Sequence, residues 1–361
     1  MPDISYSFGA VEESTSCKVI SANGKNDQNN TECLQQVQKF LTDNDSENPK
    51  VIYITHGFQD GGGWLSSLSY NLFKRYGKKA LVVAKVYWKA GANARSMNPH
   101  YPELSTATEK EFPYCKSSTC QALGCCVIGN FIPYGTSSVN TWPIGNVVGY
   151  VHNEIKKNTN ILTYCIGFSL GAHVCGFFGK MTRALNQDTP IQKIIGLDPA
   201  GPMWEYPDHD PELRLNRNDA KTVEIFHTNT IHQGFENAIG HIDLYINGGA
   251  LQPNCPKWQI WQIMADICNH KFALKLLNHI LNNENKPCYA KWKCDTISGA
   301  DLLEIKQENS DQLQKAKCKE MLGIDSKLKV GDLDEASRDD YEYGVFWIQV
   351  DENSETCKMD T

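Results

Sequence analysis

The sequence predicts an α/β fold in which helices cover both faces of a mainly parallel sheet. Helical patterns at 66–76, 144–157 and 170–185 stand between several short apolar runs. Alternation of this kind is typical of parallel sheets, whose strands are joined by crossing helices. The runs have the length and β-branched content of buried strands, and they are VIYIT (51–55), LVVAKVYW (81–88), ILTYCIGF (161–168), KIIGLD (193–198) and TVEIFHT (222–228).

The flanking regions differ from this alternating core. Residues 1–49 are polar, and we expect loops and one short helix there (QQVQKFL). Residues 94–135 hold four cysteines and are expected to form a cysteine-rich surface insertion tied by disulfides. One amphipathic helix is expected after 271, followed by a polar region and a last apolar run at 343–350. No internal repeat is visible, so we predict a single domain over residues 1–361.

The cysteine content indicates a secreted protein. Fourteen cysteines without zinc-ribbon spacing favour disulfide bonds formed in an oxidising compartment. Cys165 and Cys175 lie in apolar stretches and are expected to be free core thiols, which leaves twelve cysteines for six bridges. Two sequons, at Asn29 and Asn44, fit surface glycosylation. The net charge of −7, with no run of basic residues, argues against nucleic-acid binding.

A nucleophile is expected at Ser169. The pentapeptide Gly167–Gly171 reads G-x-S-x-G, follows a predicted strand and opens a predicted helix. This tight turn needs small flanking residues, and it presents the serine at a helix N-terminus, where the dipole favours developing negative charge. The pentapeptide alone is a weak signal, but this context makes it specific for the nucleophile elbow of the α/β-hydrolase fold.

The partners of the nucleophile are expected later in the chain. Asp198 ends the next predicted strand, at the same rim of the sheet as the elbow, and fits the acid that orients a histidine. The ordinary alternative is an aspartate in a turn. The base should follow the acid along the chain. The residues alone leave six candidates open, of which His270 lies in a loop beside Cys268 and the others are His209, His227, His232, His241 and His279.

Two backbone N–H groups should stabilise the oxyanion. They are expected from Leu170, directly after the serine, and from Phe58 in the glycine-rich loop THGFQDGGGW (55–64). A bridge between Cys255 and Cys268 would close a short cover beside the base, and a packed hairpin is the alternative reading. Its apolar side chains suit a lipid interface, and those expected to contact lipid are Trp258, Trp261, Ile263 and Met264.

The motifs together resemble the pancreatic lipase superfamily. The resemblance covers roughly residues 50–275, in order, through VIYITHGF, YWKAGA, CIGFSLGAHVCGFFGK, IIGLDPAGP, AKTVEIFHT, GHIDLYINGGALQPNC and CNH. It implies a catalytic triad of Ser169, Asp198 and His270, and oxyanion donors at Phe58 and Leu170. It thereby selects His270 from the six candidates.

Within the superfamily the chain is similar to the phospholipase A1 branch, including venom enzymes. The cover between Cys255 and Cys268 is short, the loop between His227 and His241 is short, and no C-terminal β-sandwich is expected. Residues 211–220 resemble the calcium loop of some members, with Asn216 where an aspartate is usual. Loss of a carboxylate weakens a calcium site, so no cofactor and no metal are expected. A weak calcium site is the alternative, because Glu212, Arg214 and Asp219 remain.

The resemblance implies a secreted enzyme that cleaves lipid carboxylic esters at an interface, in peripheral contact with the membrane. Phospholipase A1 activity, which releases the sn-1 fatty acid, is the leading expectation. A triacylglycerol lipase is the first alternative. A catalytically silent lipid-binding homologue is the alternative of another class, although the presence of the complete triad argues against it. The sequence does not predict the oligomeric state.

Overall fold

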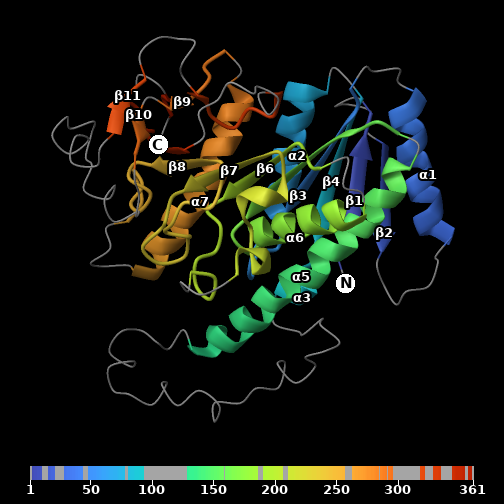
Figure 1. Ribbon diagram of the computed structural model, residues 1–361, viewed down its shortest axis with the longest axis horizontal. Coiled ribbons are helices and arrows are strands. Elements are labelled where there is room, and N and C mark those ends of the chain that lie inside the picture. Colours follow the sequence, from blue (N-terminus) through green and yellow to red (C-terminus); the bar gives the residue numbers. More distant parts are fainter. Residues whose placement is uncertain are drawn as a thin grey trace.

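The computed structural model describes residues 2–9, 15–20, 28–43, 48–77, 80–92, 128–157, 159–185, 190–205, 210–256, 262–283, 285–290, 292–295, 318–321, 328–334, 344–353 and 357–359. Their centre is one large twisted sheet with helices on its two faces (Figure 1). This is the predicted α/β-hydrolase architecture.

The middle of the sheet is parallel, and its edges are antiparallel. Seven neighbouring strands pair in parallel, in the spatial order β13, β8, β7, β6, β5, β3 and β4. The flanking strands β1, β2, β10 and β11 pair antiparallel. All five predicted core strands are confirmed. The strand order across the sheet is β11 (Cys318–Glu320), β10 (Trp292–Cys294), β13 (Gly344–Ile348), β8 (Ile242–Ile246), β7 (Thr222–His227), β6 (Lys193–Leu197), β5 (Leu162–Phe168), β3 (Lys50–Thr55), β4 (Leu81–Tyr87), β1 (Asp3–Phe8) and β2 (Thr15–Ile20).

Two helical layers bury the two faces. Helices α2 (Gly63–Tyr76) and α7 (Gln262–Asn282) cover one face, whereas α1 (Gln28–Asp43), α5 (Ile128–Lys156) and α6 (Leu170–Leu185) cover the other (Figure 1). Successive side chains of a strand point to opposite faces. In β3, Ile52 and Ile54 therefore join the core under α2, while Val51 and Tyr53 join the core under α6. Burial on both faces explains why these strands read as continuous apolar runs. The remaining described elements are α3 (Lys89–Ala92), two 3-10 helices (Pro211–Leu213 and Arg217–Asp219) and a two-stranded sheet of β9 (Tyr289–Ala290) and β12 (Leu328–Lys329).

Three predictions of local structure were wrong, one of them the start of α7, which lies at Gln262 and not after 271. The polar N-terminal region contributes β1, β2 and the sixteen-residue helix α1, where loops and a short helix were expected. Helix α5 begins at Ile128, inside the predicted insertion at 94–135. Residues 136–141 of this helix are mostly polar, yet they are buried except for a half-buried Val139. Because the buried side is polar here, the sequence lacks the apolar spacing by which a helix is recognised. The rest of the predicted insertion lies outside the described residues.

The described part of the chain contains five disulfide bonds. They join Cys17–Cys33, Cys165–Cys175, Cys255–Cys268, Cys288–Cys357 and Cys294–Cys318. The expectation of free thiols at Cys165 and Cys175 was wrong, because the elbow turns helix α6 back along β5 and brings the two sulfurs together. Among the described residues, no helix is long and apolar enough to cross a membrane.

Candidate active site

Ser169 lies in a sharp turn between β5 and α6. Its φ angle of 56° falls in the left-handed region, which is costly for a residue with a Cβ. The two flanking glycines make the turn possible. A Cβ at Gly167 would collide with the backbone of Gly171, and a Cβ at Gly171 would lie 2.6 Å from the carbonyl oxygen of Thr55. The G-x-S-x-G pattern is therefore a steric requirement of this turn.

Asp198 follows β6, the strand next to β5, and its side chain is fully buried. Oδ1 accepts hydrogen bonds from the backbone N–H groups of Thr228 at 2.7 Å and Asn229 at 3.1 Å. Oδ2 accepts a hydrogen bond from Nδ1 of His270 at 2.5 Å. These donors hold the carboxylate in one orientation, and the bond from Nδ1 leaves Nε2 of His270 as the basic nitrogen.

His270 lies within α7, where a loop position had been expected. The helix begins at Gln262, eight residues earlier, so the imidazole projects from a rigid element. Its ring centroid lies 4.6 Å from that of Phe168, the residue before the nucleophile. Within the described residues the structure records no hydrogen bond between Ser169 and His270. Such bonds are often long in enzymes without substrate and tighten when substrate binds.

The other candidate histidines have different environments. His227 bonds Asp243 at 2.9 Å and the carbonyl of Phe235 at 2.8 Å, so both ring nitrogens are used in the core. His241 accepts the backbone N–H of Val223. His279 contacts Asn283 one turn along α7. His232 lies 3.9 Å from Asp266. His209 lies outside the described residues. Of the histidines that the structure describes after Asp198, His270 is therefore the one bonded to it.

The loop after β3 lies directly against the nucleophile, and His56 anchors it. Nε2 of His56 accepts the backbone N–H of Trp88 at 3.1 Å, while the Trp88 indole donates to the His56 carbonyl at 2.7 Å. Burial lowers the pKa of His56, which favours the neutral ring that can accept this bond. The sequence pattern alone gives His56 no role, although its place in THGF is visible.

The expected oxyanion donors are adjacent in sequence to residues at the nucleophile. Leu170 follows Ser169, and Phe58 follows Gly57, whose backbone lies against the Ser169 side chain. In the described part of the chain, the N–H groups of Phe58 and Leu170 bond to no backbone carbonyl. The Phe58 ring packs edge-on against Tyr134 at 5.3 Å, which fixes its backbone position. Two N–H groups without a backbone acceptor beside a serine fit the expected arrangement for binding a negatively charged oxygen.

The predicted cover is partly described. The Cys255–Cys268 bridge is confirmed. Trp258 and Trp261 lie outside the described residues, and the side chain of Ile263 is not described. Met264 is 61% exposed in the first turn of α7.

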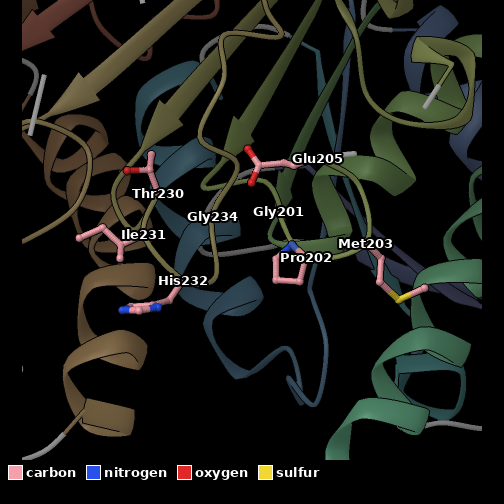
Figure 2. Close-up of a pocket in the computed structure, with 8 residues that line it drawn as sticks. All are labelled: Gly201, Pro202, Met203, Glu205, Thr230, Ile231, His232 and Gly234. Carbon is pink, nitrogen blue, oxygen red and sulfur yellow. The ribbon is translucent and has the colours of Figure 1, made fainter. Parts of the chain in front are cut away.

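A pocket of about 210 Å³ opens beside Asp198, between the loop after β6 and the loop after β7 (Figure 2). Gly234 forms its inner wall, and a Cβ there would lie 2.5 Å from Oδ1 of Asp198. Figure 2 shows the Glu205 carboxylate turned toward Thr230 across the pocket, with Met203 at the far end near α5. The volume is below that of a typical site for a whole small molecule, so the pocket has room for only part of a lipid.

Comparison with known proteins identifies the family. A family model described as "Lipase" matches residues 115–333, more than half of the chain. The chain belongs to the lipase family. This confirms the resemblance to pancreatic lipases drawn from the motifs around Ser169 and Asp198.

The relatives in this lipase family carry several names. Lipase member H of Rattus norvegicus is 29% identical over 267 residues, which cover 73% of this chain and 49% of that protein. Phospholipase A1 of Vespula squamosa is 32% identical over 211 residues, 57% of this chain and 68% of that protein. Lipoprotein lipase of Gallus gallus is 32% identical over 181 residues, 45% of this chain and 35% of that protein. The matched region spans about half the length of lipase member H.

Proposed function

We propose that the chain is a serine hydrolase of lipid carboxylic esters, with Ser169 as nucleophile, His270 as base and Asp198 as the orienting acid. The observation that carries this proposal is the hydrogen bond from His270 to a buried Asp198 at the rim where the elbow presents Ser169. The same three residue types recur in this geometry on unrelated folds in which a serine attacks a carbonyl.

The reaction proceeds by acyl transfer in two steps. Nε2 of His270 takes the proton of Ser169 as Oγ attacks the ester carbonyl, and the N–H groups of Phe58 and Leu170 stabilise the oxyanion. The imidazolium, held by Asp198, protonates the leaving alcohol as its bond to the acyl carbon breaks. Water then attacks the acyl-enzyme with His270 as base, which releases the fatty acid and restores Ser169.

Phospholipase A1 activity is the specific form that we propose. The cover closed by the disulfide between Cys255 and Cys268 is short. The loop after β7 is paired with the loop after β6 through one isolated antiparallel β-bridge, between Gly234 and Ala200. A short cover leaves the rim open to a polar headgroup. The wasp phospholipase A1 among the relatives is consistent with this form.

The rim also has the character of a lipid-contacting surface. Four exposed apolar side chains stand on α7 and on the loops after β7 and β8, namely Met264 at 61%, Leu251 at 51%, Ile231 at 44% and Ile267 at 42% exposed. Apolar side chains gathered beside a site favour binding at a membrane surface. We therefore propose peripheral contact of the rim with phospholipid.

We also propose that the protein is secreted, because disulfides form and persist outside the cell. Glycosylation at Asn29, in the first turn of α1, is part of the proposal of secretion.

Hydrolysis of a phosphatidylcholine with different acyl chains at its two positions tests this proposal. Vesicles of this lipid are compared with a triglyceride emulsion, with Ser169→Ala as the blank. Release of the sn-1 chain with little triglyceride cleavage is the expected result. Dominant triglyceride cleavage would show a triacylglycerol lipase instead. No hydrolysis of either substrate would favour a lipid-binding homologue and overturn the catalytic proposal.

A further inference from the structure

The segment that resembles a calcium loop packs tightly on one side of helix α6. It contains two short 3-10 helices, Pro211–Leu213 and Arg217–Asp219. A Cβ at Gly176 of the helix would lie 2.8 Å from the Cα of Leu215, and a Cβ at Gly179 would collide with the carbonyl of Asp219. The glycines of α6 therefore let this segment contact the helix backbone directly.

Lys180 occupies the centre of this contact. Its ammonium donates to Oδ1 of Asp219 at 2.7 Å, to Oδ2 at 2.8 Å and to the carbonyl oxygen of Arg214 at 2.8 Å. An ammonium has three N–H donors, so this segment can satisfy all of them. The Asp219 side chain is fully buried, and Oδ2 also accepts the backbone N–H of Asn216 at 2.9 Å.

Three further oxygens of the segment also have donors. Arg183 binds the carbonyl of Asn218 and the carboxylate of Glu212. Oδ1 of Asn216 accepts the backbone N–H of Asn218 at 2.8 Å. Calcium takes six to eight oxygen ligands. Lys180 and Arg183 already bind five oxygens of the segment, both carboxylate oxygens of Asp219 among them. The described residues contain no cluster of three metal-ligating side chains. The segment does not fit calcium.

The same contact reaches the candidate active site through His173, one turn after Ser169. Nδ1 of His173 accepts the backbone N–H of Leu215 at 3.2 Å, and Nε2 donates to the carbonyl of Ala200 at 2.9 Å. Ala200 lies two residues after Asp198. The segment therefore joins the helix that begins at the elbow to the loop that carries the acid.

We propose that the ammonium of Lys180 is a built-in cation that holds residues 210–219 on α6 in place of a metal ion. The folded chain then needs no calcium, and removing the charge of Lys180 frees Asp219 to bind a cation once a second carboxylate is supplied. This inference does not depend on the proposed activity, because its test measures binding and unfolding.

The test compares thermal unfolding and calorimetric calcium titration of four chains, in calcium chloride and in chelator. They are the wild type, Lys180→Met, Lys180→Met with Asn216→Asp, and the control Lys39→Met, which removes an exposed lysine paired with Asp43. The pH is kept above the pKa of Asp219, which burial raises to about 6 against the opposing effect of Lys180.

The wild type should show the same Tm with calcium and with chelator, and no binding heat. Lys180→Met should lower Tm by roughly 5–10 °C, because it leaves a buried carboxylate without its partner, whereas the exposed control should change it by less than about 2 °C. Calcium should raise the Tm of the double variant only.

Three results would overturn the proposal. They are calcium binding or chelator sensitivity of the wild type, a decrease in the Tm of Lys180→Met no larger than that of the control, or a double variant whose Tm does not change with calcium. If Lys180→Met does not fold, Lys180→Arg tests the same point. Its guanidinium restores the positive charge, so this variant should fold and stay insensitive to calcium. A calcium response in Lys180→Arg would equally contradict the inference.

Discussion

The backbone of Gly57 lies directly against the side chain of Ser169. A Cβ atom at Gly57 would lie 2.7 Å from the Cβ of Ser169 and 2.9 Å from the carbonyl oxygen of Phe168. Contacts this short do not occur between real side chains and a fixed backbone, so either the loop or the elbow would have to move. Gly57 therefore sets the distance between the nucleophile and the neighbouring N–H group of Phe58.

Gly57→Ala should impair turnover while leaving the fold intact. The added methyl displaces the N–H of Phe58, and loss of one oxyanion donor costs about 10²–10³ in kcat. Gly61→Ala is a matched control in the same loop, because a Cβ there meets no atom within 4 Å. Steady-state kinetics on a soluble ester measures both. Equal activity of the two variants would show that Phe58 does not serve as a donor.

Asp198→Asn should reduce kcat by about 10⁴ with little change in stability. The oxygen of an amide can still accept from the backbone of Thr228 and Asn229, but its NH₂ cannot accept the N–H of His270. The imidazole then loses the orientation that leaves Nε2 basic. The measurement is kcat beside a thermal unfolding curve. A variant that keeps a tenth of the wild-type kcat would contradict the role given to Asp198.

The disulfide at the elbow should stabilise the fold substantially. It joins Cys165 of β5 to Cys175 of α6, which are separated by ten positions, and Ser169 lies between them. Closing a loop of this length is worth about 3 kcal/mol. Replacing both cysteines by alanine should lower the free energy of unfolding in urea by at least that amount, because both side chains are buried. No loss of stability would mean that packing alone holds the elbow.

Two buried histidines predict loss of stability in acid. Burial lowers the pKa of His152 and of His173 from 6.5 to about 3. Between these values the unfolded chain binds protons that the folded chain does not, so the free energy of unfolding falls as the pH falls. His152→Gln should make the slope shallower by about 1.4 kcal/mol per pH unit within that window, because one such group is removed. Urea unfolding at several pH values measures the slope, and an unchanged slope would refute this assignment.

The strands that carry the site could be predicted because they are buried on both faces. The glycines beside Ser169, the aspartate after β6 and the cysteine before His270 are local signals that short motifs preserve. Helix α7 was placed too late because Asp266, Asn269 and His270 are polar residues on its buried face. Buried polar residues of this kind interrupt the apolar spacing that identifies a helix.

Contacts between distant parts of the chain could not be predicted. Lys180 and Asp219 are 39 positions apart, and nothing in the sequence around either residue indicates that the two form an ion pair. The pairing of Cys165 with Cys175 needed the direction in which α6 leaves the elbow, which only the fold specifies. Strands β1 and β2 were missed because polar residues interrupt their apolar ones. Half-buried Asp3 and Ser5 alternate with buried Ile4 and Tyr6 in β1, and β2, the edge strand, exposes Thr15, Ser16 and Lys18.

Labelling with a fluorophosphonate probe tests directly whether Ser169 is the nucleophile, because the probe reacts with an activated serine and needs no knowledge of the lipid. The labelled chain is digested, and mass spectrometry locates the modified peptide. We expect one modified residue, Ser169, with labelling lost in Ser169→Ala and strongly slowed in Asp198→Asn. Absence of labelling in the folded wild type, or labelling that persists in Ser169→Ala, would contradict this assignment.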